Sequence, residues 1–160
     1  EGRADDASEH YQRSLVLCRD AADKRGEANA LWRLGQADLA ASRLEAARTQ
    51  LSAALQAFRA ADMWKELLGC LEDHAVLSHL EGGLDTAVRI AATATVARQR
   101  LGLKHSPLDE QHWQQRLDAL RAALPDAAFV AAWTEAWDHW EIEDAVRGAL
   151  SPAGSAALAA

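Results

Sequence analysis

The chain is poor in the residues that interrupt helices or favour sheets. It has only three prolines in 160 residues, and its β-branched residues are few. Proline ends helices and β-branched side chains favour strands, so these shortages argue for helices throughout and against an all-β fold. Alanine, with 37 residues, and leucine, with 22, are far above ordinary usage, and both are strong helix formers. The composition therefore predicts an all-α chain that is long enough for one domain with a sizeable core.

Three further shortages exclude classes of protein. The two cysteines, Cys18 and Cys70, are too few and too far apart for a disulfide framework or a paired-thiolate zinc site, so we expect small buried side chains. No stretch approaches the roughly 18 apolar residues that span a bilayer, and no signal peptide begins the chain. The net charge of −7 argues against binding to a nucleic-acid backbone. We therefore expect a cytoplasmic protein with neither a membrane nor a nucleic acid as its partner.

What the sequence does contain is a repeat of about 40 residues. Turn elements recur at 1–3, 41–43 and 81–83, and alanines recur at Ala7, Ala47 and Ala87. This period is typical of stacked helical hairpins. We expect Asp62 to cap a helix, and Ser106 to cap another that begins with Pro107. The expected helices cover about 4–22, 24–41, 44–60, 63–80, 84–101, 107–123, 126–138 and 142–150.

The small residues of the repeat indicate where helices approach closely. Gly35 and Ala47 are placed to face each other in one hairpin, and Ala75 and Ala87 repeat the pair in the next. The chain begins without Met and inside a repeat, with a helix whose partner is missing. We therefore expect a fragment of a longer protein.

A known family shares some of these residues. The run Leu31-x-x-Leu34-Gly35, followed by Ala47 and Leu51, resembles the tetratricopeptide signature, although Asp38 replaces the usual aromatic and the closing proline is absent. Units of this length, together with the segment after residue 101, resemble the C-terminal repeats of bacterial signal-transduction ATPases and of LuxR-type or MalT-like regulators. The resemblance implies an α-solenoid of antiparallel helix pairs over 1–101, with its first repeat truncated. It further implies a divergent helical cap over 102–150, followed by a disordered tail at 151–160.

A stacked scaffold of this kind works by presenting a surface, so candidate residues are those on its inner curve. Trp32 stands out, because Leu31 and Leu34 already serve the core and the indole should point another way; it would either anchor a partner or pack against the adjacent unit. The partner-binding residues that we predict on the inner curve are Asn29, Trp32, Gln36, Leu39, Glu72, Val76 and His79.

A second candidate is an aromatic stripe near the end of the chain. Trp133, Trp137 and Trp140 follow one another at i, i+4 and i+7, and Phe129 extends the series. Such a stripe either packs on the preceding helix as a cap or forms an exposed docking patch for another domain. Both interpretations remain open at the level of sequence.

No arrangement in the sequence points to catalysis. There is no phosphate-binding loop, no nucleophile elbow and no zinc-protease motif. His105 and His112 flank a helix start beside Asp109 and Glu110, where a solvated turn accounts for them better than a metal site. We therefore predict a non-enzymatic scaffold without cofactor or metal, which binds a protein, a peptide or a small effector. The alternative is a structural self-association module, or a free-standing adaptor without an effector.

Overall fold

The computed structural model describes residues 2–151, with side chains from residue 7 onward. These described residues form eight α-helices and no strand, which confirms the all-α prediction. The expected disordered tail lies outside the described residues, except for Ser151. The helices are α1 (Gly2–Asp20), α2 (Lys24–Ala40), α3 (Leu44–Ala60), α4 (Trp64–Leu80), α5 (Leu84–Leu101), α6 (Pro107–Ala122), α7 (Asp126–His139) and α8 (Ile142–Leu150).

The turns that follow the first five helices recur every 20 residues. Each has one residue in the left-handed backbone region, with φ between 52° and 83°, and the next residue donates its N–H to the carbonyl five positions back at 2.8–3.0 Å. This is the hydrogen bond of a Schellman motif, which satisfies a carbonyl left over at the helix end. Two helices and two such turns give the 40-residue period. The left-handed residues are Ala22, Ser42, Asp62, Gly82 and Gly102.

Of the two predicted helix caps, one is confirmed and the other is wrong. Ser106 caps α6 as expected, because its hydroxyl accepts from the backbone N–H of Asp109 at 3.2 Å and Pro107 is the first helical residue. Asp62 does not have the expected role: its φ of 52° makes it the left-handed residue of a turn, and α4 begins only at Trp64. The physical reason is that a cap requires an extended backbone, which the preceding helix end does not allow.

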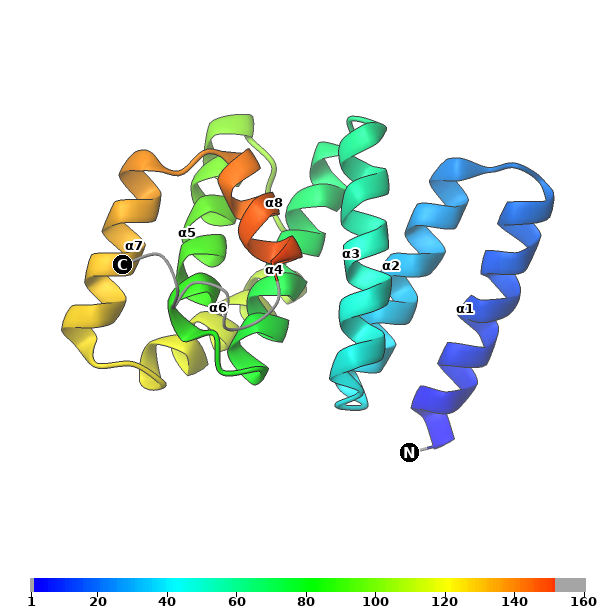
Figure 1. Cartoon of the computed structure of the whole chain (residues 1–160), viewed down its shortest axis with the longest axis horizontal. Coiled ribbons are helices and arrows are strands. Elements are labelled where there is room, and N and C mark those ends of the chain that lie inside the picture. The colour runs from blue at the N-terminus through cyan, green and yellow to red at the C-terminus, as the bar shows by residue number, and fades with distance from the viewer. Residues whose placement is uncertain (1, 152–160) are drawn as a thin grey trace. The chain divides into compact units, whose positions relative to one another are not determined.

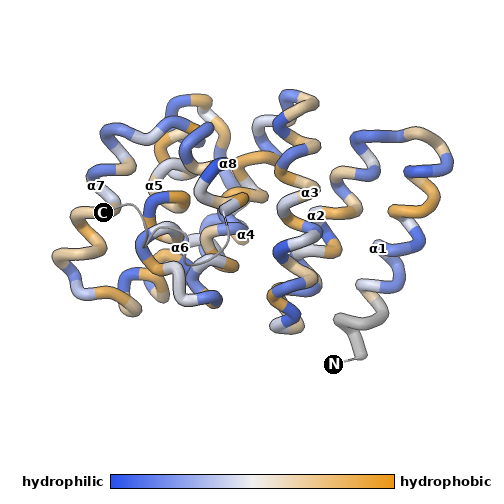
Figure 2. The backbone as a smooth tube through the Cα atoms, viewed as in Figure 1, coloured by the Kyte–Doolittle hydropathy of each residue, from blue (hydrophilic) through white to orange (hydrophobic). Residues whose placement is uncertain are grey.

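The chain divides into two compact units, 1–73 and 74–160, with the boundary inside α4. The sequence placed its own division elsewhere, at residue 101. In the first unit, α2 packs against α1 on one side and α3 on the other (Figure 1). Hydrophobic and hydrophilic residues alternate along these three helices (Figure 2), as expected for helices with one face in a core. The buried residues at the centre of this unit include Leu31, Leu34, Leu51, Leu55 and Phe58.

The approach of α2 to α3 is very close at Gly35. A Cβ atom at this position would lie 2.6 Å from the side chain of Leu51 and 3.2 Å from its backbone nitrogen. The sequence predicted that Gly35 faces Ala47; the expected close approach is found, and the atoms nearest to Gly35 belong to Leu51. The reason is that helical side chains lean toward the N-terminus, which brings Leu51 back over the turn that contains Ala47. Ala47 itself is fully buried.

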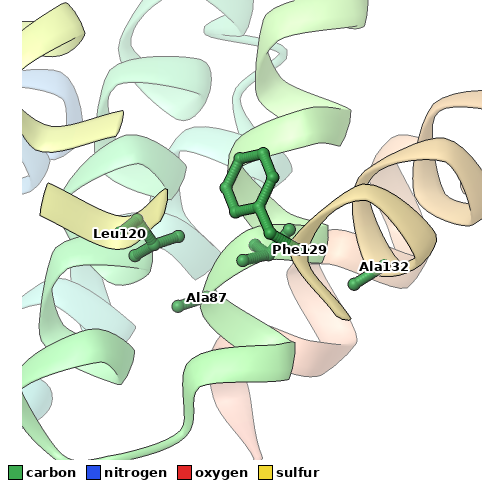
Figure 3. Packing of buried hydrophobic residues seen from close by; sticks show 5 residues of the cluster. Ala87, Leu120, Phe129 and Ala132 are labelled. Atoms are coloured by element: carbon green, nitrogen blue, oxygen red, sulfur yellow. The ribbon is translucent and has the colours of Figure 1, made fainter. Parts of the chain in front are cut away.

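In the second unit, α5 is the central helix, and α6, α7 and α8 each pack against it (Figure 1). Figure 3 shows part of the resulting core, where residues of three different helices converge. Ala87 and Val88 come from α5, Leu120 from α6, and Phe129 and Ala132 from α7. Helix α8 also packs on α5, and its buried residues are Ala145, Val146 and Ala149.

Candidate functional site

In the first unit, the structure brings two of the predicted surface residues together on a buried carboxylate. The indole N–H of Trp32 and the side-chain amide of Gln36 both donate to Oδ2 of Asp73, each at 2.8 Å. Asp73 is only 2% exposed, whereas Trp32 and Gln36 are half-buried. A buried charge is costly unless it is hydrogen-bonded, so this carboxylate holds both α2 side chains in place.

The same network continues outward along α2. The side-chain oxygen of Gln36 accepts from Arg33 at 3.0 Å, while its nitrogen donates to Asp73. The Arg33 guanidinium lies 5.3 Å from the centroid of the Trp32 ring, within the range of a cation–π contact. On its inner side, Trp32 meets Phe58 edge to face, with centroids 5.6 Å apart. Trp32 is thus a half-buried aromatic side chain that is fixed from several directions.

The other predicted residues of the inner curve have more ordinary environments. Asn29 is half-buried, and its side chain donates to the backbone carbonyl of Arg25 at 3.0 Å. Leu39 is half-buried, and Glu72 is 6% exposed. The remaining two, Val76 and His79, belong to the second unit. The predicted inner-curve set is therefore distributed over two units, and within the first unit Trp32 and Gln36 share Asp73 as a hydrogen-bond acceptor.

The 40-residue repeat predicts Glu72, and not its neighbour Asp73, as the counterpart of Trp32. A signal was available: Glu72, Asp73 and His74 follow one another between the apolar stretches 67–71 and 75–77 of the same helix. Consecutive polar residues in such a helix indicate at least one buried polar interaction. The repeat alone did not say which of the three faces α2.

Cys70, one turn before Asp73, is a structural residue. It is fully buried, and its thiol donates to the backbone carbonyl of Leu51 at 3.4 Å. Burial raises the pKa of the Cys70 thiol well above its usual value, and the nearby Asp73 carboxylate raises it further. A thiol that remains protonated is a poor nucleophile and a poor metal ligand. This geometry agrees with the expected small buried side chain.

In the second unit, Val76 and His79 line a small cavity of about 210 Å³. The lining residues from α6 include the apolar side chains of Trp113, Leu117 and Leu120. The volume is below the 300–1,000 Å³ that is typical of small-molecule sites. The cavity can accept one or two side chains rather than a whole ligand.

The aromatic stripe of α7 is partly core and partly surface. Phe129 is 8% exposed and stacks on Trp133, with centroids 5.6 Å apart, and Trp133 stacks in turn on Trp137 at 6.3 Å. Trp133 packs against the core of the second unit, whereas Trp137 is half-buried one turn further on. Val130, seven residues before Trp137 and so on the same face, is 48% exposed. The expected stripe therefore extends from a buried end to an accessible one.

Trp140 does not continue this stripe. Helix α7 ends at His139, and Trp140 has an extended backbone with ψ of 136°. The centroid of its ring lies 5.6 Å from the Arg89 guanidinium of α5. A Cβ atom placed on Gly148 of α8 would have Trp140 and Thr86 as its nearest neighbours. The i+7 spacing is interrupted because the helical period applies only while the helix lasts. Of the three tryptophans in the predicted docking patch, Trp133 and Trp137 therefore lie in α7, whereas Trp140 lies beyond its end and packs separately.

The acidic residues near the start of α6 are held by local hydrogen bonds. Nδ1 of His105 lies 2.9 Å from one oxygen of Glu110, and Gln114 donates to the other oxygen at 2.8 Å. These hydrogen bonds, from Gln114 first and then His105, lower the pKa of Glu110. The hydroxyl of Ser106 in the same way lowers the pKa of Asp109. Within residues 7–151, no three His, Cys, Asp or Glu side chains come together in a group that could hold a metal ion.

None of the helices in the described part of the chain combines the length and the apolar character needed to cross a bilayer. Comparisons with protein-family models, with curated proteins and with solved structures find no match for this chain.

Proposed function

We propose that the chain is a non-catalytic interaction scaffold that binds a protein or peptide segment on the Trp32 face of its first unit. The observation that carries the proposal is the network in which buried Asp73 fixes Trp32 and Gln36 at the surface. Aromatic residues that are held in one rotamer before binding lose little conformational entropy when a partner docks. Trp32 has this property, because its N–H, edge and face all have partners within the unit.

The proposal includes an architecture. The helices α1–α5 form antiparallel pairs of the tetratricopeptide type, and α6–α8 form a divergent cap. The equal spacing of the five Schellman turns supports this arrangement, because each 40 residues would then add one hairpin of the same geometry. In this proposal the chain is the C-terminal regulatory part of a cytoplasmic bacterial signalling ATPase or transcriptional regulator. Any ATP hydrolysis or DNA binding would belong to other domains.

The binding site is tested by substitution after a partner has been obtained. A binding protein or peptide is isolated on the immobilised chain, purified, and titrated calorimetrically against Trp32→Ala and Trp64→Ala variants. Trp64 is the matched control, since it is 41% exposed at the start of α4 in the same unit. We expect Trp32→Ala to cost about 2 kcal/mol or more in binding, as for an interface hot spot, and Trp64→Ala to cost less than about 0.5 kcal/mol. An unchanged dissociation constant for Trp32→Ala would remove this face as the binding site.

The identity of the parent protein has a separate test. A coding sequence upstream of Glu1 that contains a phosphate-binding loop would support a signalling ATPase. An upstream sequence with only further helical repeats would instead favour a free-standing adaptor. Neither result changes the test of the Trp32 face.

A second candidate function is self-association through α7, because Val130, Trp133 and Trp137 share one face of that helix, where Val130 is exposed and both tryptophans are half-buried. An isologous contact between two copies of this face would bury the aromatic stripe. Light scattering of the purified chain distinguishes this function from the first. Self-association predicts a mass that rises with the concentration of the chain, and a monomer mass at all concentrations for the Trp137→Ala variant.

A further inference from the structure

The second unit contains a second, larger cavity. Its lining includes none of the predicted inner-curve residues and none of the tryptophans of the predicted docking patch. It has a volume of about 670 Å³ and lies between the C-terminal end of α5, the loop 102–106 and the first turns of α6. This volume falls within the range of small-molecule sites. Its principal polar and aromatic lining residues are Arg98, Gln99, Lys104, His105, Glu110 and Trp113.

The charges around this cavity favour an anion. Arg98, 9% exposed, and Lys104, on the exposed loop, contribute two permanent positive charges. The only carboxylate among the lining residues is Glu110, and both of its oxygens are already engaged by His105 and Gln114. Arg98 also interacts electrostatically with Glu110, so this one carboxylate offsets part of the positive charge. In a chain of net charge −7, this is a local concentration of positive charge.

The cavity also has a fixed wall and a fixed loop. Trp113 is 5% exposed, and its ring centroid lies 6.5 Å from that of His105 at an interplanar angle of 39°. Gly102 takes the left-handed conformation, with φ of 65°, and the N–H of Leu103 donates to the Arg98 carbonyl at 3.0 Å. This turn fixes the start of the loop that carries Lys104 and His105, and the loop and α6 line the same cavity. Two flat rings and two cations are thereby gathered around one space.

We propose that this cavity binds a small organic anion, with a carboxylate or phosphoryl group directed at Arg98 and Lys104 and a flat body against the His105–Trp113 wall. The carboxylate or phosphoryl group would accept hydrogen bonds from the guanidinium and the ammonium. This site is independent of the proposed peptide-binding face, because it lies wholly within the second unit. Either site can therefore fail its test while the other one passes.

The test is a nuclear magnetic resonance titration of the isotope-labelled chain with four probes. Benzoate and phenyl phosphate carry the two candidate anions on the same flat ring, benzamide is the neutral counterpart, and inorganic phosphate reports on the anion alone. The signals to follow are the backbone amides of Leu103 and Lys104 and the indole N–H of Trp113. For probes of this size we expect dissociation constants of about 1–10 mM for benzoate, phenyl phosphate or both, with benzamide much weaker.

Two variants and a control make the test specific. Lys104→Gln alters an exposed loop residue and should weaken binding of the anionic probe about three- to fivefold. Arg98→Gln should weaken it at least about tenfold, because it removes a charged hydrogen-bond donor. Lys65→Gln, an exposed lysine in the first unit, should leave the affinity unchanged. If Arg98→Gln fails to fold, Lys104→Gln still decides the result.

The outcomes separate clearly. A saturable shift at these three signals, stronger for the anionic ring than for benzamide and reduced by Lys104→Gln, supports the site. A preference for benzoate over phenyl phosphate, or the reverse, identifies the anionic group. Equal binding of benzamide, shifts that never saturate, or a Lys104→Gln variant with unaltered affinity would each overturn the proposal. Binding of inorganic phosphate as tight as that of phenyl phosphate would overturn the role of the ring wall.

Discussion

The two units build the same turn from different residues. In the first unit the left-handed positions are Ala22, Ser42 and Asp62, whereas in the second they are Gly82 and Gly102. A left-handed backbone costs a residue with a Cβ atom roughly 1–2 kcal/mol, and glycine avoids that cost. The turns of the first unit are therefore held in place by their helices and hydrogen bonds, while those of the second are also favoured by their residue type.

The two units also differ in how much space surrounds a glycine inside a helix. In the first, Gly35 lies against Leu51 at a distance that leaves no room for a methyl group. In the second, a Cβ at Gly148 of α8 would meet its nearest neighbours, in Thr86 and Trp140, at 3.6 Å, which is ordinary van der Waals contact. Packing thus requires a glycine at Gly35 in the first unit, whereas backbone conformation favours glycine at the turns of the second.

The largest expected effect is on packing. Gly35→Ala should destabilise the chain by about 1–3 kcal/mol through overpacking, even though alanine favours helices by about 1 kcal/mol. Gly148→Ala is the matched control, a helical glycine with space around it, and should stabilise the chain by about 0.5–1 kcal/mol. Urea unfolding followed by circular dichroism measures both changes. Equal effects of the same sign would show that the two helix contacts do not differ as described.

A smaller effect is expected from exchanging the turn residues. Ala22→Gly should stabilise the chain by about 0.5–1 kcal/mol, because it relieves a left-handed alanine that is exposed and makes no core contact. Gly82→Ala should destabilise it by about 1 kcal/mol. A Cβ at Gly82 would meet nothing within 4 Å, so this change isolates the backbone cost. Melting temperatures that move in the same direction for both variants would contradict the turn comparison.

The smallest effect concerns two glutamates with lowered pKa values. The pKa of Glu27, in the first unit, is lowered by hydrogen bonds from Arg19 and Lys24, whereas that of Glu110 is lowered chiefly by the neutral Gln114 and then by His105. A lowered folded-state pKa adds stability above the unfolded-state value, and this stability is lost as the pH falls through the folded-state pKa. Glu27→Gln and Glu110→Gln should therefore lower the melting temperature slightly at pH 7 and leave it unchanged in acid.

Salt sharpens this last comparison. Added sodium chloride screens the exposed pairs of Glu27 with Arg19 and Lys24, so it should reduce the effect of Glu27→Gln. It should reduce the effect of Glu110→Gln less, because the main partner of Glu110 carries no charge. The measurement is the melting temperature of each variant relative to the original chain at low and high ionic strength. An equal response to salt in both variants would argue that the two carboxylates are held in the same way.

Much of the secondary structure could be predicted because its signals are local. The breaks at 41–43 and 81–83, the Ser106 cap and the end of the last helix all depend on residues within one or two turns of each other. Asp62 was assigned the wrong role for a related reason. An aspartate favours both a cap and a left-handed turn, and only the 20-residue spacing of the turns separates these two roles.

Less of the candidate sites could be predicted. Trp32 and Gln36 were predicted from their expected place on the inner curve, but Asp73 lies one position away from the residue that the repeat selected. The spacing of Trp133, Trp137 and Trp140 suggested one stripe, yet the end of α7 at His139 divides it. The cavity beside Arg98 left no pattern in the sequence, since its lining comes from two helices and the loop between them.

The amino-acid sequence by itself determined that this protein is helical, where its helices begin and end to within a few residues, and that its first five helices repeat. These properties follow from propensities and hydrogen bonds that act over about five residues. Only the tertiary structure decided that Asp73 receives hydrogen bonds from residues 41 and 37 positions earlier, and that Gly35 meets Leu51. Such contacts depend on the rotation and offset of one helix against another, and a shift of one residue turns a helical side chain by about 100°.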